Sequence, residues 1–214
     1  FRDIREGLAR IREEKARQQS RLPLVAALTT LSTANMRQTV DIYEAFRNDV
    51  DIFVFYLSWW IDEASAKEHD RDFAGRFGFA PTLHWGWVGD WVIKDVDTLA
   101  EQLAEVRRRS APFSEPAVNV IPNITARDDL ARYYADHSAR FGFDRCISIF
   151  QAVELDSGGN MSPCRDYHDY VVGNVREKTI TELWNSPAYT AFRSSLEQKG
   201  LMPACTRCCG LMGY

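Results

Sequence analysis

Apolar segments of strand type alternate with amphipathic helical segments over the first two thirds of the chain, and this order constrains the fold most. Helical spacing of apolar residues predicts a helix over residues 1–19 and another over 35–48. Apolar runs rich in β-branched and aromatic residues predict strands over 22–31, 51–59 and 117–122. Strands that alternate with helices in this way form right-handed βα units, so the repeat predicts a parallel sheet.

This sheet is expected to be the second half of a β/α barrel. Helices expected over 97–106 and up to residue 140 complete three βα units, whereas a closed parallel barrel ordinarily has eight strands. Because the sequence begins at Phe1 inside a helical pattern, we expect earlier βα units to be missing. The predicted fold class is α/β, with half of a TIM-like barrel followed by a small α+β domain.

The pattern changes near residue 143, where we place a domain boundary. Residues 146–154 alternate as a strand, 156–160 (DSGGN) carry a strong turn signal, and 161–164 begin a return strand, so a hairpin is predicted. A helix follows over 179–199 and opens with a Thr179–Glu182 capping box. The predicted domains are therefore 1–143, with an acidic and tryptophan-rich insert near 60–95, and 144–214.

The composition excludes several classes of protein. The 214 residues are 45% hydrophobic and 26% charged with a net charge of −4, so broad binding to a nucleic-acid backbone is not expected. The longest apolar run, 52–61, has ten residues and is interrupted by Ser58, whereas a membrane span needs roughly 20. No secretory signal pattern is found. We expect a cytoplasmic protein with no membrane partner.

Four of the five cysteines form a candidate metal site. Cys146 and Cys164, with seventeen residues between them, flank the predicted hairpin, and Cys205 and Cys208 form a C-x-x-C motif. Four converging thiolates suit a tetrahedral soft-metal site, either zinc or a cubane 4Fe-4S cluster. Cys209 is interpreted as an unliganded neighbour that could replace Cys208. Disulfides, which need an oxidising compartment, and unrelated buried cysteines are the alternatives.

Several motifs in this region occur together in a definite order. They are Cys146-x12-Gly159-x4-Cys164, the runs 172–175 (VGNV) and 179–185 (TITELWN), Phe192-Arg193, and Pro203-x-Cys205-x2-Cys208. In combination they resemble the SPASM/Twitch-type auxiliary-cluster domain of radical S-adenosylmethionine (AdoMet) enzymes. The resemblance implies one auxiliary 4Fe-4S cluster that relays an electron or shapes the substrate pocket.

The upstream part resembles the second half of the radical AdoMet barrel, with Thr29, Thr30 and Asn35 following the first predicted strand. In that family a polar residue near this strand end usually contacts the AdoMet ribose. The resemblance therefore implies that Thr30, Ser32 or Asn35 binds this cofactor. Helix capping is the alternative role for Ser32 and Asn35.

The sequence also departs from the family pattern. Radical AdoMet enzymes hold their catalytic cluster with C-x3-C-x2-C, and no cysteine precedes Cys146 here, so the chain alone is not expected to cleave AdoMet. No catalytic residue is assigned. A full SPASM pattern has a further cysteine at the position that Tyr214 occupies, so the shorter one-cluster Twitch pattern fits.

The resemblance implies a function for the parent enzyme. The chain is expected to be the C-terminal portion of a radical AdoMet oxidoreductase or maturase that acts on a peptide or small molecule. The missing N-terminal half of the barrel is the expected partner, and exposed strand edges predict self-association of the chain. The alternative is a zinc-stabilised binding or scaffold module in which the cysteines are structural.

Three further features keep two interpretations each. Arg165 and Arg207, beside the cysteines, either stabilise the charge of the cluster or are solvated. His168 is interpreted as a polar loop contact, with metal ligation as the alternative. The tryptophans of the insert form either its own small core, which we favour, or a substrate lid or protein-contact surface, and His84 is interpreted as structural.

Overall fold

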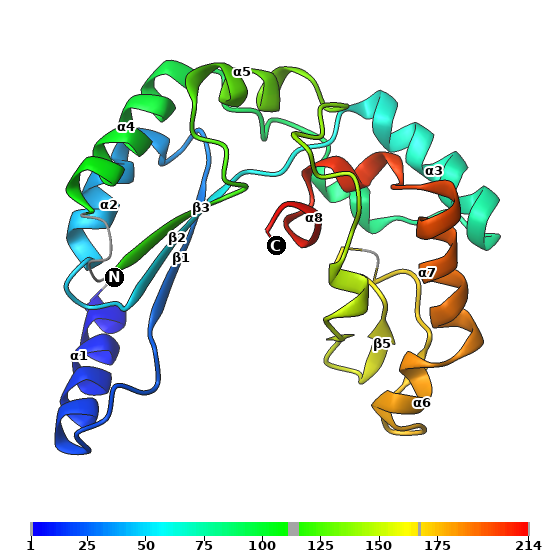
Figure 1. The fold of residues 1–214 in the computed structure, drawn as a ribbon, viewed down its shortest axis with the longest axis horizontal. Helices are drawn as coiled ribbons and strands as arrows, with labels where there is room; N and C mark the ends of the chain where they lie inside the picture. The colour runs from blue at the N-terminus through cyan, green and yellow to red at the C-terminus, as the bar shows by residue number, and fades with distance from the viewer. Residues whose placement is uncertain (1, 111–115, 167, 214) are drawn as a thin grey trace. The chain divides into compact units, whose positions relative to one another are not determined.

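The computed structural model describes residues 2–110, 116–166 and 168–213, without the side chain of Cys209, and its elements follow the predicted order (Figure 1). The chain divides into two compact units. The first consists of Phe1–Ser58 and Ile93–Ala131, and the second of Trp59–Val92 and Arg132–Tyr214. The boundary near residue 143 stays a prediction about domains, but the insert groups with the C-terminal residues and not with the predicted barrel half.

The first unit contains a three-stranded parallel sheet in the order β1-β2-β3. The strands are β1 (Ala26–Leu31), β2 (Ile52–Leu57) and β3 (Ala117–Ile121), and both pairings are parallel, as predicted. The helices of the unit are α1 (Arg2–Arg17), α2 (Thr39–Phe46), which follows the short 3-10 turn η1 (Met36–Gln38), and α4 (Val96–Arg109). The described residues form no closed barrel, so the partial barrel remains an expectation.

One face of the parallel sheet is covered and the other is open. Phe53 and Phe55 are fully buried on the covered face, and Tyr43 of α2 meets Phe53 with its ring centroid at 5.7 Å. Figure 1 shows α2 and α4 together on this side of the sheet. Alternate residues of a strand point to opposite faces. On the opposite face Leu28 of the edge strand β1 is 66% exposed, whereas its register partner Val54 on the central strand β2 is 8% exposed.

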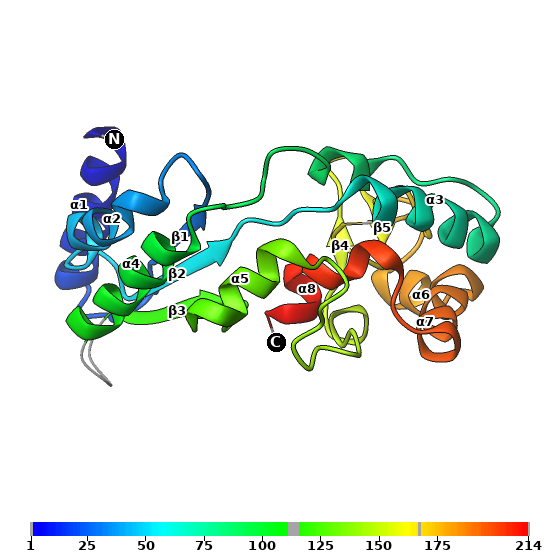
Figure 2. The same ribbon diagram turned by 90° about the horizontal axis from the view of Figure 1, so that it is seen from above.

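The second unit contains short elements. A three-stranded antiparallel sheet has the order β4-β5-β6, and Figure 2 shows β5 near α7. The strands are β4 (Glu154–Leu155), β5 (Asn160–Ser162) and β6 (Gly173–Asn174). The helical elements are α3 (Glu63–Phe77), η2 (Leu83–Trp87), η3 (Ser148–Phe150), α6 (Ile180–Trp184), α7 (Pro187–Lys199), η4 (Pro203–Arg207) and α8 (Cys209–Met212), while α5 (Arg127–Ala135) runs from one unit into the other.

Two predicted elements differ from the structure. The strand expected over 146–154 is largely wrong, because a 3-10 turn at Ser148–Phe150 comes first and β4 has only two residues. The helix expected over 179–199 is two helices. Ser186 caps α7 by accepting a hydrogen bond from the backbone N–H of Tyr189, and Pro187 occupies the first turn. Proline has no backbone N–H to donate to α6, so a new helix begins there. The Thr179–Glu182 capping box is confirmed.

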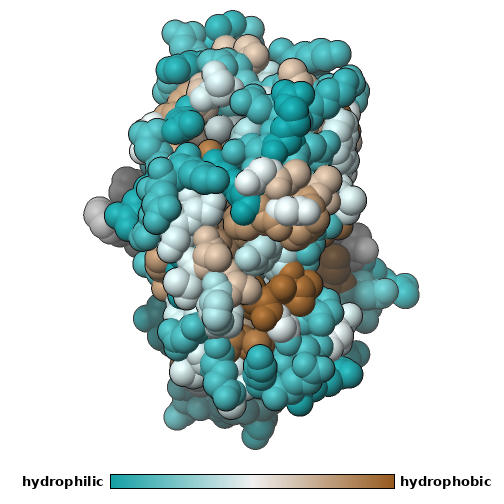
Figure 3. All heavy atoms as spheres, turned by 90° about the vertical axis from the view of Figure 1, so that its right-hand side faces the viewer, coloured by the Kyte–Doolittle hydropathy of each residue, from teal (hydrophilic) through white to brown (hydrophobic). Residues whose placement is uncertain are grey.

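The surface is mainly polar on the side that Figure 3 presents, where hydrophilic side chains surround a limited group of apolar ones. Within the described residues, no helix has both the length and the apolar character that crossing a membrane requires.

Candidate metal centre

The cysteines of interest lie on loops and short turns of the second unit. Cys146 precedes η3, Cys164 follows β5, Cys205 lies within η4, and Cys208 comes directly after η4. All four are free thiols. The turn between β4 and β5 reverses the chain, because Asp156 accepts the backbone N–H of Asn160, and the antiparallel pairing then sets where Cys164 lies.

An apolar cluster of the second unit surrounds these cysteines. Cys205 belongs to the cluster, and Cys146 and Cys164 pack against it. The other buried members come from both parts of the unit and are Ile61, Ala66, Phe73, Ile149, Phe192, Met202 and Ala204. Residues of the insert thus share a core with the cysteines. No tryptophan among the described residues of the insert belongs to this apolar cluster, so the small core of insert tryptophans stays a prediction.

Cys208 lies in a charged and buried environment. Its Sγ donates a hydrogen bond to Oδ2 of Asp166 at 2.8 Å, and it accepts one from the backbone N–H of Gly210 at 3.2 Å. Burial, followed by the charges of Asp166 and Cys164, raises the pKa of the Cys208 thiol well above its usual range. Cys205 adds to this effect. Three of the four cysteines are therefore close enough to influence one another's ionisation.

Cys146 has two backbone donors at its sulfur. Burial raises the pKa of the Cys146 thiol, and hydrogen bonds from the N–H groups of Ile149 and Ser148 oppose this shift. A sulfur that accepts backbone N–H groups is prepared to carry negative charge, because hydrogen bonds to the charged form favour it. The η3 turn that replaces the predicted strand supplies these donors.

Asp166 is a residue of this site that the sequence reasoning missed. Burial raises the pKa of Asp166 to about 6, although the Cys208 hydrogen bond and the charge of Arg165 lower it. The signal in the sequence was a carboxylate two residues after Cys164.

Gly210 leaves room beside Cys208. A Cβ atom at this position would lie 3.2 Å from Sγ of Cys208 and 3.4 Å from Oγ of Ser148. These distances are tighter than ordinary van der Waals contact, so a larger residue would have to displace one of the two loops. The close approach also shows that the loop after Cys146 and the C-x-x-C motif lie side by side.

The two arginines beside the cysteines have different roles. The side chain of Arg165 is 52% exposed and lies 3.3 Å from Glu154, which fits a solvated residue. Arg207 is 2% exposed. Its guanidinium donates to the carbonyls of Tyr133 at 3.1 Å, Ala139 at 2.7 Å and Thr206 at 2.7 Å, and also to that of Asp136. Arg207 therefore holds the C-x-x-C turn against residues 133–139.

Two histidines of the unit are buried near this region. Thr206 donates its hydroxyl to the carbonyl of His137 at 2.7 Å, and His137 lies 3.7 Å from Asp62, the N-cap of α3. His84 is 2% exposed, and its Nε2 lies 3.3 Å from both the Ala66 carbonyl and Asp70. These contacts agree with a structural role for His84. His168 is half-buried, and its predicted role as a loop contact stays a prediction.

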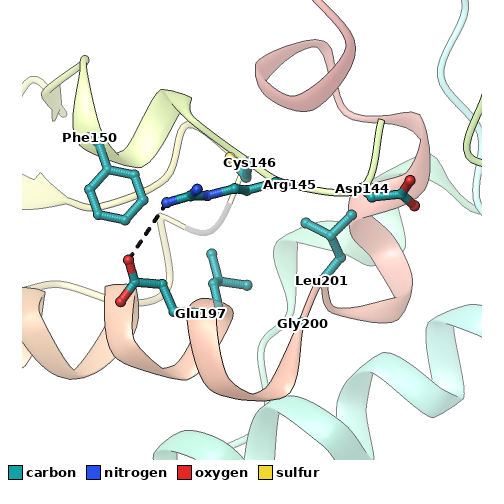
Figure 4. Close-up of a pocket in the computed structure, with 8 residues that line it drawn as sticks. Asp144, Arg145, Cys146, Phe150, Glu197, Gly200 and Leu201 are labelled. Atoms are coloured by element: carbon teal, nitrogen blue, oxygen red, sulfur yellow. Dashed lines mark ion pairs between the residues drawn. The ribbon is translucent and has the colours of Figure 1, made fainter. Parts of the chain in front are cut away.

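A narrow cavity connects the insert with the C-x-x-C motif inside this unit. It is lined by Trp59, Ile61, His84, Trp87, Asp166, Ala204, Arg207 and Cys208. The indoles of Trp59 and Trp87 pack with centroids 4.9 Å apart, whereas Trp85, Trp87 and Trp91 stay about 36–41% exposed. A second and larger cavity is lined by Cys146 and by residues at the end of α7 (Figure 4).

The donor set fits a thiolate-bound group. Across residues 2–110, 116–166 and 168–213, no three His, Cys, Asp or Glu side chains form a group that could hold a metal ion as they stand. The cysteines nevertheless share one apolar cluster, and backbone N–H groups reach two of their sulfurs. Iron–sulfur clusters are bound by cysteine thiolates and are tuned by such hydrogen bonds and by burial. Cys146, Cys164, Cys205 and Cys208 are the residues that could hold one.

The residues expected to bind AdoMet lie in the first unit, at the carboxyl end of β1. Asn35 donates its Nδ2 to the carbonyl of Thr30 at 2.9 Å and accepts the backbone N–H of Ser32 at 2.8 Å. It precedes η1 but makes no side-chain capping hydrogen bond. Asn35 therefore ties the β1 loop together and does not cap η1. The predicted contact with AdoMet stays untested.

Comparisons with known proteins address the C-terminal residues. No curated protein and no solved structure matches the chain. Residues 146–209 match the family model of SPASM, an iron–sulfur cluster-binding domain. The match begins at Cys146 and includes Cys164, Cys205 and Cys208, so the C-terminal part of this chain is similar to an iron–sulfur cluster-binding domain of the SPASM type.

Proposed function

We propose that residues 146–209 bind one auxiliary 4Fe-4S cluster through Cys146, Cys164, Cys205 and Cys208. The observation that carries this proposal is the similarity to the SPASM domain over a segment whose four cysteines share one apolar cluster. When bound, a cubane held by four thiolates supplies one-electron transfer. With a cysteine on each iron no position stays open, which favours electron transfer or substrate positioning over direct ligation of substrate.

The chain's own residues have defined tasks in this proposal. The N–H groups of Ser148 and Ile149 donate to the sulfur of Cys146, and the N–H of Gly210 donates to that of Cys208, so negative charge at both sulfurs is stabilised. Asp166 accepts the hydrogen bond of the Cys208 thiol, which gives that proton an acceptor inside the site. Arg207 keeps the C-x-x-C turn in place through its hydrogen bonds to the carbonyls of Tyr133 and Ala139.

The parent activity we propose is that of a radical AdoMet oxidoreductase or maturase acting on a peptide or small molecule. The parallel βα units and the polar residues Thr30, Ser32 and Asn35 at the end of β1 support it. Cleavage of AdoMet would require a C-x3-C-x2-C motif, supplied by the N-terminal half of the barrel. The edge strands of the sheet, β1 and β3, would pair with that half, and Leu28 on the exposed sheet face is 66% exposed.

In its absence we expect these exposed strand edges to cause self-association. Light scattering that shows a clean monomer would contradict this expectation.

Anaerobic reconstitution tests the cluster. The purified chain is expected to take up about four irons and four sulfides and to show the electron paramagnetic resonance signal of a reduced cubane. Cys205→Ala is expected to lose it. Cys209→Ala is the matched control and should keep the cluster.

Three results would overturn or revise the assignment. One zinc per chain with no iron uptake would favour the alternative, a zinc-stabilised binding or scaffold module. Retention of the cluster by Cys205→Ala would sink the proposed ligand set. Loss in Cys209→Ala together with retention in Cys208→Ala would exchange the roles of these neighbours.

A further inference from the structure

A cavity of about 430 Å³ lies beside Cys146 in the second unit, and its other lining residues have no part in the proposed cluster site. Its size falls in the range of small-molecule sites, which is about 300–1,000 Å³. Phe150, Leu196 and Leu201 form its apolar lining, and Arg145 and Glu197 its charged lining. Asp144 completes the charged residues and lies 3.6 Å from Arg140, so it already has a cationic neighbour.

Two opposite charges face each other across this cavity. Nη2 of Arg145 lies 3.9 Å from Oε1 of Glu197, and Figure 4 shows the arginine extending past the Phe150 ring toward the carboxylate. The two side chains are 75% and 51% exposed. An exposed and loosely formed pair of this kind contributes little to stability. A ligand that carries both charges can therefore replace it at small cost.

The last turn of α7 gives the cavity a direction. Leu196 and Glu197 lie in that turn and Gly200 caps it, and all three line the cavity. A helix C-terminus carries partial negative charge and favours cations. The Glu197 end therefore suits an ammonium group. The Arg145 end suits a carboxylate, which a guanidinium can bind through two parallel hydrogen bonds.

We propose that this cavity binds a zwitterionic α-amino acid with an apolar side chain. The carboxylate would pair with Arg145, the ammonium with Glu197, and the side chain would lie on Phe150, Leu196 and Leu201. Because Cys146 lines the same cavity, the ligand would lie against a cluster ligand in the loaded protein. The amino-acid site itself does not depend on the cluster.

Calorimetric titration of the full chain with L-leucine tests the site. We expect saturable binding with a dissociation constant on the order of 1 mM or tighter. Arg145→Gln and Glu197→Gln should each weaken it by about tenfold, since each removes a charge-assisted contact. Arg176→Gln and Glu177→Gln are matched controls, because both residues are exposed in the same unit outside the cavity, and they should leave binding unchanged.

N-acetyl-L-leucinamide separates charge recognition from apolar contact, because it keeps the side chain and lacks both charges. Equal binding of this compound and L-leucine would overturn the proposal, as would the absence of saturable binding or equal weakening by the control variants. Iron content is measured on the same samples. A chain without iron that binds leucine counts against the cluster alone, and an iron-loaded chain that ignores leucine counts against the amino-acid site alone.

Discussion

The two units of this protein differ in the residues that form their interiors. The first has a parallel sheet with a stacked aromatic core, in which Phe53 and Phe55 lie 4.8 Å apart, and it contains no histidine and no cysteine. The second has strands of two or three residues and contains all four histidines, all five cysteines and all six tryptophans of the chain. It also buries an arginine and three histidines.

This difference indicates how each unit gains stability. Burial of apolar side chains on a continuous sheet is enough for the first, whereas such short strands are marginal without other support. In the second unit Arg207 satisfies its guanidinium with backbone carbonyls, and Cys208 donates its thiol hydrogen to Asp166. A bound metal group commonly supplies the missing folding free energy in sites of this kind.

Removal of iron is expected to produce the largest difference in amide exchange between the two units. In protein reconstituted with iron and sulfide and then treated with a chelator, amide exchange should accelerate throughout residues 160–174 and 187–208. Structural metal binding contributes on the order of 10 kcal/mol in small thiolate sites. Amide exchange in residues 26–57 should stay unchanged, because the first unit contains no cysteine. Equal acceleration in both segments, measured by mass spectrometry, would refute this comparison.

Deleting one buried ring from each unit sharpens the comparison. Phe53→Ala in β2 and Phe73→Ala in α3 remove side chains with no exposed surface, and each should cost about 3–5 kcal/mol. Phe53→Ala should increase amide exchange in β1, β2 and β3. Phe73→Ala should increase it in α3 and η4, which both contribute residues to the apolar cluster around the cysteines. Each variant serves as the other's control. Spread of either effect across both units would show that they unfold as one.

Acid is expected to weaken the second unit at a pH that the first tolerates. Burial, together with the charges of His84 and Arg76, lowers the pKa of His69 to about 3, although the charge of Asp169 opposes this shift. Burial lowers the pKa of His137 to about 4. An unfolded histidine has a pKa near 6.5, so below that pH the unfolded chain binds more protons. The stabilisation by the neutral rings is complete above about pH 6.5 and is lost as the pH falls toward 4.

The size of this effect is about 2 kcal/mol per histidine at pH 5. In the first unit a hydrogen bond from Val25 and the nearby Lys15 lower the pKa of Asp51, so its contribution is lost only in stronger acid. Urea titrations at pH 7 and 5 followed by tryptophan fluorescence report on the second unit alone. His69→Leu should reduce the pH difference by about 2 kcal/mol. An unchanged difference in that variant would contradict the assignment to His69.

Much of the first unit could be predicted from local patterns. The strands around Phe53 and Val118 and the helix that contains Leu99 and Leu103 are confirmed, since the period of apolar residues reflects burial on one face. The second unit was less predictable. A 3-10 turn follows Cys146 in place of the expected strand. This turn could not be predicted, because backbone N–H groups that donate to a sulfur do not change the spacing of apolar side chains.

The sequence by itself determined the parallel βα units, the capping box of α6 and the cysteine pattern that resembles a cluster-binding domain, because each depends on residues close together in the chain. Only the tertiary structure decided that the insert shares its core with Cys205, that Arg207 is buried while Arg165 is solvated, and that Asp166 meets Cys208. These contacts join segments far apart in sequence. Burial and pairing at such a distance depend on how the chain packs, which no local pattern of residues records.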